Sequence, residues 1–353
     1  MPTVDQNLKG TTGGRHPVPA GEVEGSEPAA GSFRTWFAEH RRDDVYFVLG
    51  VQGSGTNLVA RVLQSVFEFS AVLDGSLIFD AAVRVERRPR REIVQREFEY
   101  VRNRLFPSDL RRRFAWKHHH HRNAGFVEMD RHFDPSLIAN GGDFARFFYT
   151  YQAWKLGRRH MLVKSDDLWQ NIESLGLLFP RRKVIFLVRD PRDNALSISH
   201  KNFGPCDLFQ AARYTERQLR LYSREAARRP QDAISVKYET LLDEPISFVQ
   251  EFAARFGFDV PMEAVDMLER LHIRSDNSQK WRRLSSRDLS ACDWVFRRHL
   301  QDFGYPMSGH VPEPPSLPGR FGRRVNDLLR RVPQKVGRVV RSLTDSTPGV
   351  VPR

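Results

Sequence analysis

The fold of this chain is decided by the stretch Lys183-Val-Ile-Phe-Leu-Val-Arg-Asp-Pro-Arg-Asp-Asn-Ala-Leu-Ser-Ile-Ser199. Its short, β-branched apolar run is typical of an interior parallel strand, and Pro191 ends that strand and favours the start of a helix. Arg189 would then lie at the carboxyl end of the strand, the edge where open α/β sheets bind ligands. Ser197 follows about two helical turns later, so a guanidinium and a hydroxyl could meet on one phosphate. The stretch predicts an anion site, and an Arg–Asp pair that only caps a helix is the alternative.

A second phosphate-binding pattern lies upstream. An apolar run at 45–51 predicts a strand, Gln52-Gly-Ser-Gly-Thr-Asn57 predicts a glycine loop, and apolar residues at helical spacing follow from Leu58. Such a loop lets backbone N–H groups approach an anion beside a helix N-terminus. The lysine of the nucleotide-triphosphatase signature is absent, because Thr56 and Asn57 follow Gly55. Phosphate binding and a simple tight turn both remain open for this loop.

Together the two segments resemble the family of sulfotransferases that use 3′-phosphoadenosine 5′-phosphosulfate (PAPS). The family loop Pro-Lys/Arg-Ser-Gly-Thr is matched at Gln52-Gly-Ser-Gly-Thr56, and Arg-Asp-Pro-Arg-Asp followed by a serine is matched without a gap from Arg189 to Ser197. Two later segments, 234–245 and 278–284, follow in family order. The likeness spans residues 44–306 and is densest from Met161 to Ser199, which also resembles bacterial and protein-tyrosine sulfotransferases.

This resemblance implies an α/β fold with a P-loop-type parallel central sheet flanked by helices. It also implies transfer of a sulfuryl group from PAPS to a hydroxyl or amine of a carbohydrate, lipid-linked or small-molecule acceptor. No metal is expected, because cationic side chains can stabilise the charge. Two alternatives stay open: a P-loop small-molecule kinase, and a sulfotransferase-like protein that only binds a nucleotide or an anionic glycan.

The resemblance also assigns the donor site. The residues expected to bind PAPS are Gly53, Ser54, Gly55, Thr56, Asn57, Arg189, Ser197, Tyr238, Ser278 and Lys280. The loop residues would wrap the 5′-phosphosulfate, whereas Arg189 and Ser197 would hold the 3′-phosphate. Tyr238 would lie near the nucleotide, and Ser278 and Lys280 belong to a late segment that closes over it. Arg192 is expected to face the acceptor or the adenosine.

The basic loop residue that usually stabilises charge in the family is missing from this chain, so another side chain must take its role. Gly53 stands where the family usually has Lys or Arg, so we expect Lys164, at the end of a strand-like run, to stabilise the developing charge. Asp74 is the expected general base, because it lies about where the tyrosine enzymes have their glutamate. His118, in the run His118–His121, is the fallback and Glu68 is a weaker candidate. The alternatives are that Lys164 is only a surface lysine at a strand end and that Asp74 is only a turn residue.

The composition is compatible with the resemblance to sulfotransferases but does not by itself indicate it. With 353 residues, of which 40% are hydrophobic, the chain can bury a substantial core. Its formal net charge of +13 favours binding to polyanions. It does not indicate whether the partner is a nucleic acid, an acidic glycan, an anionic lipid or a nucleotide. The two cysteines, Cys206 and Cys292, allow no disulfide framework and favour a reducing compartment.

The pattern along the chain predicts a domain order. We expect a disordered segment at 1–31, a sulfotransferase-like α/β domain at 32–310 with a mostly helical, arginine-rich insert at 84–160 on the acceptor side, and a loosely attached tail at 311–353. No run near the N-terminus suits a signal peptide or a membrane span, which favours a bacterial cytoplasmic enzyme.

The expected partners follow from the charged segments. The tail joins a Pro-rich linker to a basic amphipathic pattern that suits peripheral contact with an anionic membrane, docking on the parent domain being the alternative. The histidine run lacks a second ligand pair for a metal, and the arginines lack any specific nucleic-acid motif. The pattern does not predict an oligomeric state.

Overall fold

The computed structural model describes residues 32–73, 76–105, 129–165, 167–201, 204–273 and 278–314. Several predictions from sequence therefore lie outside the described residues. These concern the N-terminal segment, the basic tail, Asp74 and His118.

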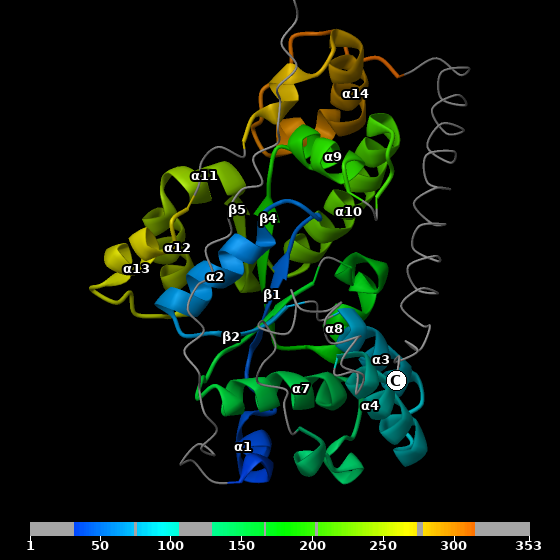
Figure 1. The fold of residues 1–353 in the computed structure, drawn as a ribbon, viewed down its shortest axis with the longest axis vertical. Coiled ribbons are helices and arrows are strands. Elements are labelled where there is room, and N and C mark those ends of the chain that lie inside the picture. Colours follow the sequence, from blue (N-terminus) through cyan, green and yellow to red (C-terminus); the bar gives the residue numbers. More distant parts are fainter. Residues whose placement is uncertain are drawn as a thin grey trace, which may run out of the picture.

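The centre of the molecule is a sheet of five parallel strands in the order β2-β3-β1-β4-β5 (Figure 1). The strands are β1 Val45–Leu49, β2 Ser70–Leu73, β3 Met161–Lys164, β4 Arg182–Val188 and β5 Ala233–Lys237. β1 is buried along its whole length, as expected for a strand covered on both faces. The predicted fold class, a parallel α/β sheet flanked by helices, is confirmed.

Two layers of helices cover the sheet, and the strand side chains alternate between them. Val45, Phe47 and Leu49 of β1 enter one core, while Tyr46 and Val48 enter the other. The helices packed on the first core are α1 Phe33–His40, α3 Ser76–Arg87, α4 Arg91–Leu105, α7 Gly141–Lys155, α8 Leu175–Leu178, α9 Pro191–Ser199, α10 Leu208–Arg228 and α14 Ser286–Asp302. The second core is covered by α2 Thr56–Val66, α11 Tyr238–Asp243, α12 Pro245–Phe256 and α13 Ala264–Arg270.

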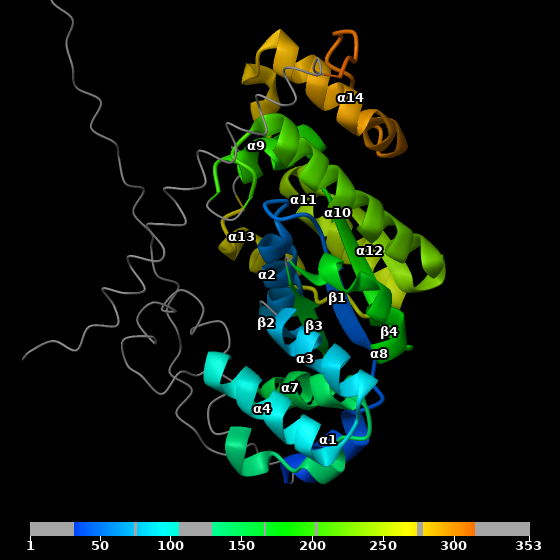
Figure 2. The ribbon, with the colours of Figure 1, turned by 90° about the vertical axis from the view of Figure 1, so that its right-hand side faces the viewer.

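The described part of the arginine-rich insert is mostly helical. It contains the end of α3, α4, two short 3-10 helices at Met129–His132 and Pro135–Leu137, and α7. Residues 141–154 of α7 are all buried, and the side chain of Asn140 caps the helix by accepting the Asp143 N–H at 2.9 Å. The turn between α3 and α4 lies at the other end of the molecule from α9 and α14 (Figures 1 and 2). None of the described helices is long and apolar enough to cross a membrane.

Candidate donor-binding site

The carboxyl ends of all five strands meet at one edge of the sheet. From β1 the chain moves to β2 and β3 on one side, and later to β4 and β5 on the other. The helices that follow β1 and β4, α2 and α9, cover opposite faces. Such a topological switch point opens a crevice at the carboxyl ends of the two strands, where α/β proteins bind ligands. The glycine loop follows β1 and Arg189 follows β4, so the two predicted phosphate segments flank this crevice.

The glycine loop adopts a conformation that only glycine tolerates well. Gly53 has φ = +85° and Gly55 has φ = +99°, both in the left-handed region. A Cβ at Gly53 would lie 2.8 Å from the Ser197 hydroxyl oxygen, and a Cβ at Gly55 would collide with the ring of Tyr238. The loop thus packs directly on α9 and on the start of α11. With this backbone, a lysine or arginine at position 53 would be strained and would crowd Ser197.

Arg189 joins the two segments. Its side chain is only 3% exposed, and its Nη1 donates a hydrogen bond to the carbonyl oxygen of Gly53 at 2.7 Å. The guanidinium carbon also lies 4.9 Å from the centre of the Tyr238 ring, within cation–π range. Residues from three distant parts of the sequence therefore form one cluster, made of Gly53, Gly55, Arg189, Ser197 and Tyr238.

Lys164 lies beside the loop at the end of β3. It pairs in register with Val48 of β1 and with Leu73 of β2. Because Leu162 enters the second core and side chains alternate along a strand, the Lys164 side chain lies on the face that carries α2. It is 3% exposed. Nearby, Gln52 Nε2 donates to Asp167 Oδ1 at 3.2 Å and so ties the loop to the segment after β3.

Comparison with known proteins agrees with this geometry. A sequence model of the sulfotransferase family matches residues 46–262. The chain belongs to the sulfotransferase family. The family predicted from the sequence is thereby confirmed, and the matched range contains the loop, Lys164, Arg189, Ser197 and Tyr238. No curated protein matches this chain.

Several solved structures are similar to this sulfotransferase at low identity. The sulfotransferase domain of the Synechococcus PCC 7002 olefin synthase is 15% identical, with a TM-score of 0.44 over 74% of this chain and 94% of its own. The sulfotransferase domain from the curacin biosynthetic pathway is 13% identical, with a TM-score of 0.48 over 75% and 98%. Sulfotransferase STF9 from Mycobacterium avium is 14% identical, with a TM-score of 0.43 over 79% and 83%.

The loop of this sulfotransferase fits a phosphate-bearing donor. The Ser54 hydroxyl is fully buried and has no hydrogen-bond partner among the described residues. α2 begins at Thr56, and the helix dipole places partial positive charge at its first residues, Thr56 and Asn57. Buried hydroxyls and helix-terminal N–H groups are donors suited to phosphate oxygens. The residues present are therefore suited to bind a phosphate group.

The late segment of this sulfotransferase is attached to α9. The backbone N–H of Trp281 donates to Asp193 Oδ1 at 2.8 Å, and the Trp281 ring packs against the Arg192 guanidinium at 3.6 Å. Ser278 and Lys280 precede Trp281 in this segment and are half-buried and exposed, respectively. The sequence predicted that this segment belongs to the site. It did not predict Asp193 as its anchor, although the second Asp of the Arg-Asp-Pro-Arg-Asp motif was the available signal.

Two expectations from sequence are wrong. The Arg192 side chain has 0% exposure, and its guanidinium donates to Asp190, Asp293 and the Pro306 carbonyl, so it is a structural link between α9 and α14 rather than a contact for the acceptor or adenosine. Glu68 lies beyond the far end of α2 from the loop and pairs with Arg158 at 2.6 Å, so it is not near the carboxyl ends of the strands. Asp74 and His118, outside the described residues, stay predictions.

Another polar pair near this edge involves α3. Asn171 donates to the Asp80 carboxylate at 2.7 Å and so joins the segment after β3 to α3. Burial raises the pKa of Asp80, although Asn171 and Arg84 act in the opposite direction. In the same described ranges, no group of three or more His, Cys, Asp or Glu side chains could hold a metal ion.

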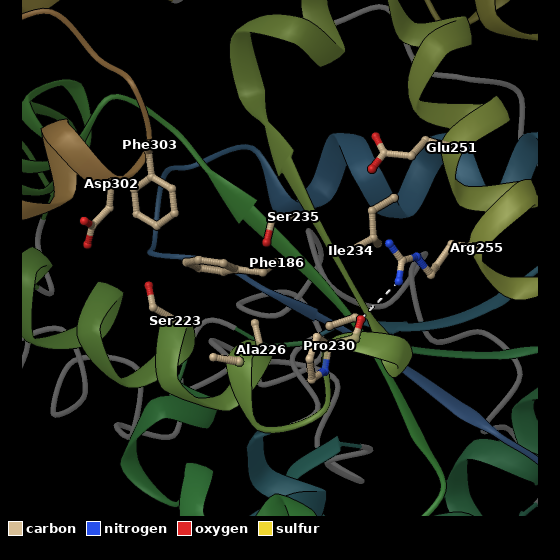
Figure 3. Close-up of a pocket in the computed structure, with 12 residues that line it drawn as sticks. Phe186, Ser223, Ala226, Pro230, Ile234, Ser235, Glu251, Arg255, Asp302 and Phe303 are labelled. Atoms are coloured by element: carbon tan, nitrogen blue, oxygen red, sulfur yellow. Dashed lines mark hydrogen bonds between the residues drawn. The ribbon is translucent and has the colours of Figure 1, made fainter.

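A separate pocket of about 410 Å³ lies beside the edge strand β5 (Figure 3). Phe186, Ile234, Ser235 and Phe303 line it, with Glu251 and Arg255 from α12 at one side. Its β5 residues are at the amino end and the middle of the strand, whereas Tyr238 follows the carboxyl end. This pocket is therefore not part of the donor-binding crevice.

Proposed function

We propose that this sulfotransferase takes PAPS as its donor and transfers the sulfuryl group to a hydroxyl or amine of a carbohydrate, lipid-linked or small-molecule acceptor. The observation that carries the proposal is the hydrogen bond from Arg189 to the Gly53 carbonyl. It joins the loop expected to bind the 5′-phosphosulfate to the motif expected to bind the 3′-phosphate, and a nucleoside donor that carries phosphate groups at both its 3′ and 5′ positions fits that pairing.

The residues of the loop would bind the 5′ end. Backbone N–H groups at the start of α2 and the hydroxyls of Ser54 and Thr56 would donate to phosphate and sulfate oxygens. Because these donors are fixed by the fold before binding, they stabilise charge without reorganising. Arg189 and Ser197 would hold the 3′-phosphate, with Tyr238 beside the nucleotide and Ser278 and Lys280 closing over it.

Lys164 would stabilise the charge that develops on the leaving phosphate. When bound, PAPS supplies the sulfuryl group, and the protein supplies orientation and charge. Lys164 takes this role because Gly53 carries no side chain, and because the end of β3 is adjacent to the strand that leads into the loop. Asp74 would accept the proton of the acceptor hydroxyl or amine as its oxygen or nitrogen attacks sulfur, with His118 as the alternative base.

The clue to the acceptor lies in the sequence of the C-terminal segment rather than in the described site. The basic pattern at 321–343 would suit a lipid-linked acceptor at an anionic membrane surface, and these residues lie outside the described ranges. A small soluble hydroxyl compound is the alternative acceptor.

A binding comparison tests the donor. Isothermal titration of the full chain with adenosine 3′,5′-bisphosphate (PAP) and with ATP should give tighter binding of PAP, because the proposed crevice holds a 3′-phosphate. Tighter binding of ATP would overturn the donor assignment and favour a kinase. Sulfate transfer from PAPS to a panel of hydroxyl and amine acceptors then tests the reaction itself. PAP binding without transfer to any acceptor class would favour a protein that only binds nucleotide.

A further inference from the structure

We propose that Asp193 is a positioning residue that holds Arg189, the expected 3′-phosphate contact, and the segment 278–283, which is expected to close over the donor, in one arrangement. The inference rests on the proposed function, because it concerns the same donor site. Asp193 would not touch the donor itself. It would act by fixing the side chain of Arg189 and the backbone that precedes Trp281.

The two oxygens of Asp193 serve different partners. Oδ1 accepts the backbone N–H of Trp281 at 2.8 Å, and Oδ2 lies 3.5 Å from Nη2 of Arg189. The Asp193 side chain is fully buried. Since a buried carboxylate is costly unless it is paired and hydrogen-bonded, both contacts are needed for its charge. Burial raises the pKa of Asp193, and the Trp281 N–H and Arg189 act to lower it.

An asparagine at this position cannot replace both contacts. A carboxylate offers two acceptor oxygens, whereas a carboxamide offers one acceptor and one donor. In either orientation its NH2 group would face the Trp281 N–H or the Arg189 guanidinium, and both of these are donors. Asp193→Asn therefore removes one arm of the bridge with almost no change of volume.

The hydrogen bond from the Trp281 N–H to Asp193 acts at Lys280, a residue expected to bind the donor. The N–H that Asp193 accepts belongs to the peptide group joining Lys280 to Trp281, so it fixes the backbone of Lys280 directly. Gln279, just before it, has φ = +57°, a left-handed conformation that is costly for a residue with a Cβ. Such a conformation persists only where the surroundings impose it.

The other side of Trp281 is held independently. Its ring lies 3.6 Å from the guanidinium of Arg192, which Asp190 and Asp293 fix in turn. The Trp281 side chain is therefore anchored without Asp193, and loss of the Asp193 contact would release chiefly the 278–280 backbone. Because the Trp281 side chain and the 278–280 backbone are held by different residues, a change at Asp193 tests the backbone contact alone.

The test compares two nucleotides that differ by the 3′-phosphate. Titration of wild-type protein and Asp193→Asn with PAP and with AMP should show PAP affinity falling about tenfold, the effect of one lost hydrogen bond to a charged group, while AMP affinity changes less than about twofold. An equal loss for both nucleotides, or no loss for PAP, would overturn the positioning role.

Asp143→Asn is the matched control. Asp143 is also a buried carboxylate that accepts a backbone N–H, from Ala139 at 3.2 Å, and faces an arginine, Arg41, at 3.8 Å. It lies in α7, away from the donor crevice. We expect this variant to lose thermal stability without changing the ratio of PAP to AMP affinity. A changed ratio would show that any buried aspartate has this effect, and would overturn the inference.

Two further variants keep the inference falsifiable. If Asp193→Asn fails to fold, Asp193→Glu keeps the charge and displaces the carboxylate, and it should lower PAP affinity but not AMP affinity. In a double-mutant cycle with Lys280→Ala, the PAP losses should be less than additive, because Asp193 acts partly through Lys280. Additive losses would contradict that route. If the wild-type protein does not prefer PAP to AMP, the proposed function fails instead.

Discussion

The donor crevice and the turn between α3 and α4 use arginine in opposite ways. Arg189 and Arg192, at the crevice, are almost fully buried and paired with carboxylates. The arginines of the α3–α4 turn are exposed; they are Arg87, Arg88, Arg90 and Arg91. Buried guanidinium groups are fixed in position and feel a low dielectric, whereas exposed ones are screened by water and salt. Arginine content therefore does not mark the proposed donor site in this protein, because the exposed arginines gather at the α3–α4 turn, away from it.

The largest effect on turnover should come from replacing Lys164. This variant tests whether a buried cation near the proposed donor site acts in the reaction. Replacing it with Met should lower the turnover of sulfate transfer by about 10²- to 10³-fold, as for loss of one transition-state contact, with PAP affinity nearly unchanged. Lys183→Met is the control, because Lys183 pairs with Asp232 at the opposite end of the sheet. It should reduce stability but not turnover. Equal turnover losses would contradict the role of Lys164.

The next largest effect is expected on PAP affinity, and it compares two buried arginines at opposite ends of β4. Arg189→Ala should weaken PAP binding by about 10- to 100-fold, because a charged contact to the 3′-phosphate and the support of Gly53 are both lost. Arg182→Ala is matched to it, since Arg182 is also buried and pairs with one carboxylate, Glu225. Both variants should lose about 3–5 kcal/mol of unfolding free energy. Unfolding and titration experiments would show whether only Arg189→Ala changes PAP affinity; a similar change in both would remove the distinction.

A smaller effect is expected at Gly53. Alanine there costs about 1–2 kcal/mol for its left-handed backbone and also crowds the Ser197 hydroxyl. Gly157→Ala is the control, because Gly157 has φ = +62° and a Cβ there would meet no described atom within 4 Å. Thermal melts should show similar backbone costs, whereas only Gly53→Ala should weaken PAP binding. Unchanged PAP binding in Gly53→Ala would show that the loop does not contact the donor.

The smallest effect is expected at the α3–α4 turn. Changing its four exposed arginines to glutamine should alter stability by less than about 0.5 kcal/mol and leave PAP affinity within about twofold. Turnover with the accepted substrate should also be unchanged, because the turn lies far from α9 (Figure 1). A large loss of turnover at unchanged PAP affinity would break the comparison and support the prediction that the insert faces the acceptor.

The sequence predicted the fold class and the family better than the arrangement of the polar side chains. Short β-branched runs before Gly50 and Arg189 indicated buried parallel strands, because such strands are covered on both faces. The glycines at 53 and 55 indicated a loop between strand and helix, and the structure adds that both have left-handed backbone. Arg192 was misread because its partner Asp293 lies 101 residues away in the sequence and no local pattern encodes that contact.

By itself, the sequence determined the strand–loop–helix units and the family, since periodicity, turn chemistry and a short motif are local properties of the chain. Only the tertiary structure decided which polar atoms meet. It placed Ser197 against Gly53, turned Arg189 onto the loop, buried Arg192 between two helices and joined Asp193 to the Trp281 backbone. The physical reason is that the position of a polar group depends on which segments bury it, and burial is set by packing between elements that are far apart in the chain.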